Sequence, residues 1–159
     1  MSKLTVNLTV NNKKYEKEIN SNLLLVDFLR DYLNLTGTHI GCDTSQCGAC
    51  MVMLNGKAVK SCSILVAQLD NQEIVTIENI NENDKLHPMQ EAFRKNHGLQ
   101  CGFCTPGMII SAISLVKENN NPNEEDIRKY IEGNFCRCTG YHNIIKSISE
   151  GAKDMQNKE

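Results

Sequence analysis

The stretch "GCDTSQCGAC", Gly41 to Cys50, contains three of the chain's eight cysteines, at the spacing C-x4-C-x2-C. A fourth cysteine, Cys62, follows after eleven intervening residues. Gly41, Gly48 and Ala49 carry little or no side chain, so the main chain around these thiols can approach a bound group closely. We therefore expect this stretch to form a loop that presents cysteine ligands.

Short strands are expected on both sides of this loop. "LTVNLTV" (4–10) and "YEKEI" (15–19) alternate apolar and polar side chains, which predicts a hairpin. After the loop, "ACMVML" and "KAVKS" flank Asn55-Gly56, a strong signal for a second hairpin, and "EIVTIE" (73–78) is the expected last strand. Ahead of the loop, Ser21 or Asn22 is expected to cap a helix with apolar residues at helical spacing: Leu25, Phe28, Leu29, Tyr32 and Leu33.

The pattern becomes helical after "NINENDK" (79–85), a polar stretch without periodicity that we interpret as a linker. Four short helices are predicted in "HPMQEAFRKNHG", "TPGMIISAISLVKENN", "NEEDIRKYI" and "YHNIIKSISEGAKDM". Thr105 is expected to cap the second of these, with Pro106 at its first position. We therefore predict an α+β chain with one domain at 1–78, a linker at 79–85 and a four-helix bundle at 86–159.

The cysteines divide equally between the two regions, with Cys42, Cys47, Cys50 and Cys62 before the linker and Cys101, Cys104, Cys136 and Cys138 after it. Four thiolates can hold one two-iron, two-sulfur (2Fe–2S) cluster or one structural zinc ion. The first set has the spacing of plant-type 2Fe–2S ferredoxins. The second set, C-x2-C and C-x-C separated by 31 residues, suits either a cluster or a four-cysteine zinc site.

Other features of the sequence narrow the function. The strand pattern at the N-terminus differs from the apolar core of a signal peptide, which predicts a cytoplasmic protein whose cysteines serve metal or chemistry and not disulfides. No run approaches the roughly 18 apolar residues of a membrane span. Seventeen basic against nineteen acidic side chains give no electrostatic reason to expect nucleic acid as a partner. No glycine-rich nucleotide-binding motif is present, so we expect no catalytic residue in this chain.

Four segments together, "GCDTSQCGAC", "KSC", "LQCGFCTPGM" and "GNFCRCTGY", resemble the motifs of the small iron–sulfur subunit of the molybdenum hydroxylases. This family includes xanthine dehydrogenase, aldehyde oxidoreductase and aerobic carbon monoxide dehydrogenase, and the small subunit of the last type is the most similar. The resemblance extends over nearly the whole chain. It implies one 2Fe–2S cluster in a plant-ferredoxin-like β-grasp domain and one in a four-helix bundle. Both would relay electrons from a molybdopterin centre to FAD while the complex oxidises an aldehyde, a heterocycle or carbon monoxide.

The resemblance also implies partners and site residues. Molybdopterin, with its cytosine dinucleotide form as one option, would lie in a large subunit and FAD in a medium subunit, in a dimer of heterotrimers. All eight cysteines would ligate iron. Gln100 would contact the pterin, and Cys138 would also accept a hydrogen bond from the pterin amino group.

Several other residues have open roles. The histidines are expected at surface or capping positions, and His39 is also a candidate for a contact near Cys42. Phe103 is expected to screen a cluster from water or to pack in the core. Two other functions fit the same residues: a free-standing two-cluster ferredoxin, and a zinc-stapled interaction module with no redox role.

Overall fold

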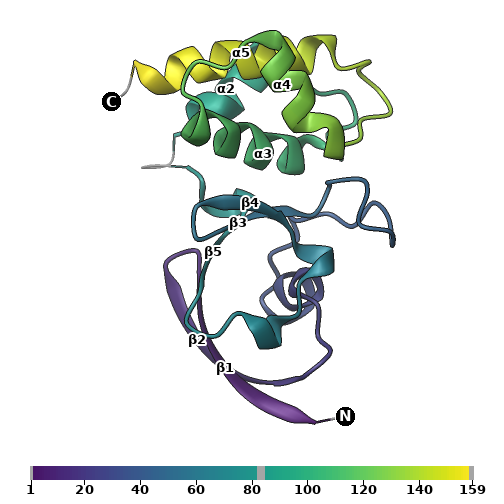
Figure 1. The fold of residues 1–159 in the computed structure, drawn as a ribbon, viewed down its shortest axis with the longest axis vertical. Coiled ribbons are helices and arrows are strands. Elements are labelled where there is room, and N and C mark those ends of the chain that lie inside the picture. Colours follow the sequence, from purple (N-terminus) through teal and green to yellow (C-terminus); the bar gives the residue numbers. More distant parts are fainter. Residues whose placement is uncertain (1, 82–84, 158–159) are drawn as a thin grey trace.

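A computed structural model of the chain describes residues 2–81 and 85–157. Its strands are β1 (Lys3–Val10), β2 (Lys13–Asn20), β3 (Met51–Leu54), β4 (Lys57–Lys60) and β5 (Glu73–Val75). Its α-helices are α1 (Leu25–Asp27), α2 (Pro88–Lys95), α3 (Thr105–Glu118), α4 (Glu124–Tyr130) and α5 (His142–Gln156). Single 3-10 turns lie at Ser61–Ser63, Val66–Gln68, Ile77–Asn79 and Ile131–Gly133. The expected α+β class is confirmed, with the sheet in one half of the molecule and α2 to α5 in the other (Figure 1).

The sheet has the strand order β2-β1-β5-β3-β4. Strands β1 and β5 are parallel, and the other neighbours are antiparallel. Both predicted hairpins are present. The second turns at Asn55 and Gly56, whose φ angles of 49° and 83° are the positive values that a tight two-residue hairpin turn requires. Part of the predicted linker, residues 82–84, lies outside the described residues.

The first core lies between the sheet and the segment that follows β2, and it buries Leu25, Phe28 and Leu29 completely. The prediction that Ser21 or Asn22 caps this segment is wrong. Helix α1 begins after Leu24 without any side-chain cap, and the chain then widens into a π-helical turn at Phe28–Tyr32. Its start is fixed by pairing with a distant segment, since Leu25 N donates to the Ile64 carbonyl at 2.8 Å. Such a long-range contact leaves no local signal in the sequence.

The second core surrounds α3, which is buried on nearly all sides. The prediction that Thr105 caps α3 is wrong by one residue, because Cys104 occupies the cap position and Thr105 is the first helical residue. The cap residue is set by the turn that carries the cysteines, in which Thr105 N donates to the Gly102 carbonyl at 3.2 Å. His87, one of the histidines expected to cap, does cap α2, where its side chain accepts from Met89 N.

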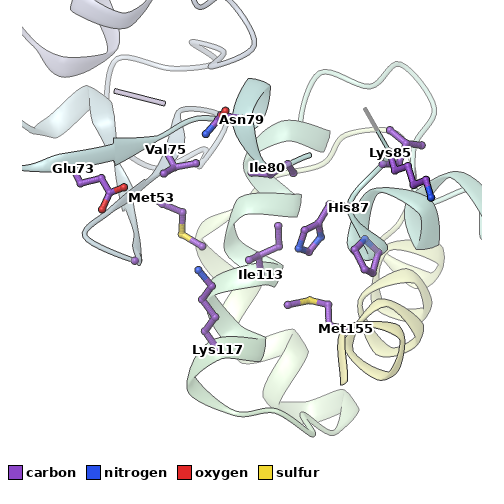
Figure 2. A pocket seen from close by; sticks show the side chains of 13 residues that line it. Met53, Glu73, Val75, Asn79, Ile80, Lys85, His87, Ile113, Lys117 and Met155 are labelled. Atoms are coloured by element: carbon purple, nitrogen blue, oxygen red, sulfur yellow. The ribbon is translucent and has the colours of Figure 1, made fainter. Parts of the chain in front are cut away.

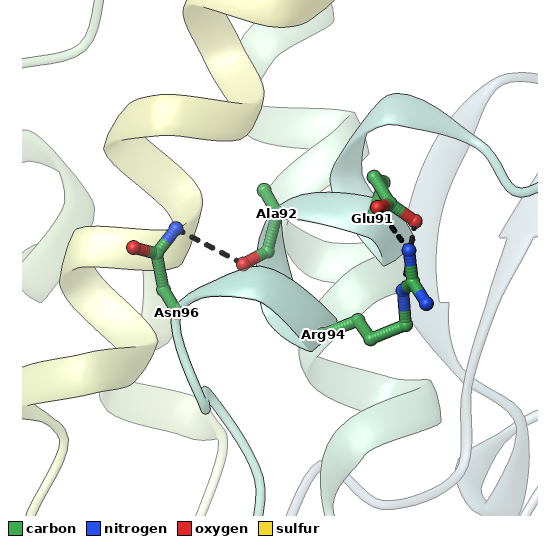
Figure 3. Close-up of polar contacts among 4 residues, drawn as sticks. All are labelled: Glu91, Ala92, Arg94 and Asn96. Atoms are coloured by element: carbon green, nitrogen blue, oxygen red, sulfur yellow. Dashed lines mark hydrogen bonds and ion pairs between the residues drawn. The ribbon is translucent and has the colours of Figure 1, made fainter.

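Polar side chains stabilise the C-terminal end of α2. Glu91 and Arg94 form an ion pair one turn apart, and Asn96 Nδ2 donates to the Ala92 carbonyl at 3.1 Å (Figure 3). The same Asn96 Nδ2 donates to Glu150 Oε2 at 2.7 Å. Asn96 therefore closes α2 and also joins it to α5.

The two cores meet across the β3–β4 hairpin, which lies directly below the helices in Figure 1. Met53 of β3 is 4 % exposed and belongs to the core of the helices, not to that of the sheet. The amide of Ala58 in β4 donates to Ser114 Oγ of α3 at 3.1 Å. This bond satisfies a backbone donor on the edge strand and joins the two halves. Within residues 2–81 and 85–157, no helix is long and apolar enough to cross a membrane.

Candidate metal centres

The loop before β3 and the turn after β4 bring the first four cysteines together. Cys47 N donates to Cys42 Sγ at 3.4 Å. The β3–β4 register aligns Met51 with Lys60, and it thereby brings Cys50 beside Cys62, so that the two thiols influence each other's ionisation. The sequence therefore folds this set into two neighbouring pairs.

Backbone amides surround Cys42 and make its sulfur a good place for negative charge. Hydrogen bonds from the backbone N–H groups of Cys47 and Thr44 lower the pKa of Cys42 to about 6. Burial instead raises the pKa of Cys47, and it raises the pKa of Cys50 to about 11, with the adjacent Cys62 thiol adding to the rise. Buried thiols of this kind become stable thiolates when a metal supplies the opposing charge.

The second four cysteines lie at the start of α3 and in the loop before α5. Cys138 Sγ is 3.5 Å from Cys101 Sγ, and both residues are exposed. This distance exceeds the roughly 2.05 Å of a disulfide, and all eight cysteines are free. Burial raises the pKa of Cys104 to about 12, and the neighbouring Cys136 thiol adds to the rise. Burial also opposes ionisation of Cys136, but hydrogen bonds from Thr139, whose Oγ1 lies 3.1 Å from Cys136 Sγ, lower its pKa.

The eight thiols thus form four pairs: Cys42 with Cys47, Cys50 with Cys62, Cys101 with Cys138, and Cys104 with Cys136. In the part of the chain that the structure describes, no three cysteine, histidine or acidic side chains converge as ligands of a single ion. A mononuclear zinc site draws four sulfurs to one point, each about 2.3 Å from the metal. A 2Fe–2S cluster takes two cysteines on each iron, so paired thiols fit a dinuclear centre.

The two cysteine loops touch each other. Phe135 N donates to the Cys47 carbonyl at 2.8 Å, and Asn134 Nδ2 donates to the Gly48 carbonyl at 3.1 Å. His39, a candidate for a contact near Cys42, reaches the second cysteine set: its Nδ1 lies 2.7 Å from the carbonyl oxygen of Phe103, between Cys101 and Cys104. Asn134 drew no attention in the sequence, because its partners are distant in the chain.

Lys60 is a second residue that sequence reasoning missed. Its Nζ donates to the Ser45 carbonyl at 2.7 Å and to the Gln46 carbonyl at 3.3 Å. Both carbonyls belong to the first cysteine loop, so this ammonium group holds the loop's shape. It also places a positive charge at the backbone between Cys42 and Cys47.

Apolar side chains are exposed around the cysteine loops. Phe103 and Phe135 are 47 % and 56 % exposed, and Leu99, next to the exposed Gln100, is 38 % exposed. The prediction that Phe103 packs in a core is therefore wrong; its ring stacks on His39 and lies against Gly41. Exposed aromatic groups of this kind are typical of a surface that another protein covers.

A pocket of about 600 Å³ opens elsewhere, between the sheet and the helices (Figure 2). Its walls include apolar side chains of β3, α3 and α5 and a few charged groups, among them Met53, Ile113, Met155, Glu73, Lys85 and Lys117. None of the eight cysteines lines it. The pocket is therefore separate from the candidate metal centres.

Comparison with known proteins agrees with this geometry. Residues 8–84 match the family model described as "2Fe-2S iron-sulfur cluster binding domain", and residues 76–149 match "[2Fe-2S] binding domain". The caffeine dehydrogenase subunit gamma of Pseudomonas sp. (strain CBB1) is 44 % identical over 93 % of this chain and 90 % of its own length. The nicotinate dehydrogenase small FeS subunit of Eubacterium barkeri is 40 % identical over 93 % of this chain and 94 % of its own.

A solved structure extends the likeness to three dimensions. A chain of quinoline 2-oxidoreductase from Pseudomonas putida 86 superposes with a TM-score of 0.93 at 37 % identity, covering 99 % of this chain and 98 % of that one. The fold, both cysteine loops and the two 2Fe–2S family matches thus coincide in one chain. The protein therefore belongs to the small iron–sulfur subunits of the molybdenum hydroxylases.

Proposed function

We propose that the first four cysteines, Cys42, Cys47, Cys50 and Cys62, hold one 2Fe–2S cluster, and that the second four, Cys101, Cys104, Cys136 and Cys138, hold another. The observation that carries this proposal is the arrangement of the thiols in pairs, which suits two irons, and the two 2Fe–2S family matches support it. A bound 2Fe–2S cluster takes up and releases one electron at a time. The chain is thus the electron-transfer subunit of an oxidoreductase complex.

The chain's own residues prepare these sites. Backbone N–H groups of Thr44 and Cys47 point their donors at Cys42 Sγ, where they offset the negative charge of a thiolate-ligated centre. Cys50 is 2 % exposed, which keeps water from one edge of the first site. Water exclusion and N–H donors are two of the means by which a protein tunes the potential of such a centre.

The second site opens to the surface, and this supports a role facing a partner that carries molybdopterin. Cys101, Cys138 and Gln100 are exposed together. We assign Gln100 to a contact with the pterin, and Cys138 to iron ligation and acceptance of a hydrogen bond from the pterin amino group. Phe103 and Phe135 would be covered by the same large subunit, since apolar rings at this exposure favour a protein contact.

We propose the rest of the assembly by analogy with the family. A medium subunit would carry FAD on the side of the first site, and electrons would pass from molybdopterin to FAD through this chain. The whole would be a dimer of heterotrimers in the cytoplasm. Within this chain, we assign a β-grasp domain to residues 1–78, a linker to 79–85 and a four-helix bundle to 86–159.

The substrate binds in another subunit, so only the relatives bear on it. Caffeine, nicotinate and quinoline, which occur in the names of three relatives, are nitrogen heterocycles, whereas other relatives at similar identity are named aldehyde oxidoreductases. We therefore propose that the complex oxidises a nitrogen heterocycle or an aldehyde. Dye reduction by the purified complex should be faster with purines, pyridines, quinolines or aldehydes than with carbon monoxide.

Electron paramagnetic resonance (EPR) of the dithionite-reduced native protein, with metal analysis of everything that co-purifies, tests the proposal. Two distinct 2Fe–2S signals, roughly four irons per copy of this chain, and molybdenum in larger partner chains are expected. Two signals from a lone chain without molybdenum would indicate a free carrier. Zinc in place of iron, with no signal, would overturn both cluster assignments.

A further inference from the structure

Asn134 lies buried between the two cysteine loops, with only 4 % of its surface exposed. Its Nδ2 donates to the Gly48 carbonyl at 3.1 Å, and its Oδ1 accepts from Ser111 Oγ at 3.0 Å. The side chain therefore joins the first cysteine loop to α3 in the other half of the chain. A buried amide with both ends bonded is a rigid spacer, because breaking either bond leaves a polar group unpaired away from water.

The backbone next to Asn134 continues this contact. Phe135 N donates to the Cys47 carbonyl at 2.8 Å. One hydrogen bond and one peptide unit thus separate Cys47, in the first set, from Cys136, in the second. This is a short through-bond connection between the two cysteine loops, and the bond from Asn134 to the Gly48 carbonyl lies directly beside it.

The contact has no free space in which to shift. Gly48 has a φ of +69°, and a Cβ there would lie 2.4 Å from the Gly133 carbonyl oxygen and 2.6 Å from Asn134 Nδ2. On the other side, a Cβ on Gly107 would lie 2.1 Å from the Gly48 carbonyl oxygen. Two glycines therefore let three backbone segments meet at van der Waals contact, and Asn134 fixes the distance at which they meet.

We propose that Asn134 is a positioning residue for electron transfer: it sets the separation and orientation of the two cysteine loops, and hence the coupling between the centres they hold. This inference rests on the proposed function, because it requires two clusters. The coupling between two electron carriers falls steeply with their separation. The magnetic coupling between two unpaired spins likewise falls with the cube of their distance. A small displacement of one loop therefore changes both quantities.

The test compares the native complex with its Asn134→Ala and Ser111→Ala variants. Asn134→Ala removes both side-chain bonds, whereas Ser111→Ala leaves the bond to the Gly48 carbonyl in place. Asn96→Ala is the matched control, since Asn96 also makes two bonds through a partly buried amide but lies at the end of α2. Iron content, the melting temperature and the low-temperature EPR splitting between the two reduced clusters are measured on each complex.

In Asn134→Ala we expect both cluster signals and the full iron content, with the splitting between them reduced or lost. Ser111→Ala should show a smaller reduction, and Asn96→Ala should keep the native splitting while its melting temperature falls. A native splitting in iron-loaded Asn134→Ala, with only a lower melting temperature, would show that Asn134 is merely structural. If Asn134→Ala fails to load iron, the EPR splitting of the Ser111→Ala complex becomes the test. A native splitting in Ser111→Ala would then overturn the inference.

Failure of the proposed function would give a different result from failure of the Asn134 inference: the native complex itself would lack two 2Fe–2S signals.

Discussion

The imidazole of His39 stacks on the ring of Phe103, with 4.6 Å between the ring centroids, and its Nδ1 lies 2.7 Å from the Phe103 carbonyl oxygen. A carbonyl oxygen can only accept, so Nδ1 carries the proton of this bond. The pair joins the residues ahead of the first cysteine loop to the turn between Cys101 and Cys104. It is a third link between the two cysteine sets, besides those of Asn134 and Phe135.

Replacing His39 by alanine should therefore weaken the junction. Loss of the hydrogen bond and of the ring contact should lower the free energy of unfolding by about 1–2 kcal/mol. Denaturant unfolding of the iron-loaded protein measures this change. His142→Ala is the control, because His142 is exposed at the start of α5 and should leave the midpoint unchanged. Equal effects of the two substitutions would contradict a bridging role for His39.

Cysteine replacement should separate the two proposed clusters. Cys138→Ser removes a thiolate from the exposed pair with Cys101, so the EPR signal of the second cluster should weaken or vanish while the plant-type signal persists. Cys62→Ser should have the opposite effect. Loss of both signals in either variant would mean that the two cysteine sets are not independent sites.

A methyl group at Gly107 should disturb the loops as well as the stability. Helix propensity alone favours alanine by about 1 kcal/mol. Overlap with the Gly48 carbonyl oxygen, however, should turn this into a net loss of about 1–3 kcal/mol. The cluster signals should also change shape, since the first cysteine loop must move.

The matched control for Gly107→Ala is Gly56→Ala, which has a φ of +83° but no atom within 4 Å of the added carbon. Backbone strain there should cost about 1 kcal/mol and leave the EPR spectrum unchanged. Unaltered cluster signals in Gly107→Ala would argue against a tight junction.

Lys60 should tune the first cluster through its charge. Reduction adds negative charge, which a nearby ammonium group stabilises, so Lys60→Met should make the reduction potential more negative by an amount on the order of tens of mV. Lys57→Met is the control, because Lys57 is exposed on the same strand. Redox titration followed by EPR measures both. A shift confined to the second cluster, or equal shifts in both variants, would contradict the assignment.

Local patterns predicted those parts of the fold that local chemistry determines. The alternation of apolar and polar side chains predicted β1 and β2, and the Asn55-Gly56 turn predicted the β3–β4 hairpin. Both features are determined by residues that are close in the sequence. The cap at Ser21 or Asn22 was wrong because a bond from Leu25 to the Ile64 carbonyl fixes where the helix begins. Contacts between distant segments override weak local preferences.

The candidate site divides in the same way. Spacing singled out all eight cysteines and divided them into two sets of four, and the structure brings the thiols of each set together in pairs. Spacing could not identify the four pairs, nor the roles of Asn134 and Lys60, because these depend on how two halves of the chain meet. The contact of His39 with Phe103 has the same cause.

The position of Met53 has a consequence for how the molecule comes apart. Its side chain packs in the core around α3 and not in the core of the sheet. Ser114 Oγ of α3 in turn accepts a hydrogen bond from the Ala58 amide of β4. Neither half can lose its packing without exposing apolar surface of the other. The chain is therefore expected to unfold in one cooperative transition. The two sets of cysteine motifs divide the sequence into two regions, but those regions should not unfold separately.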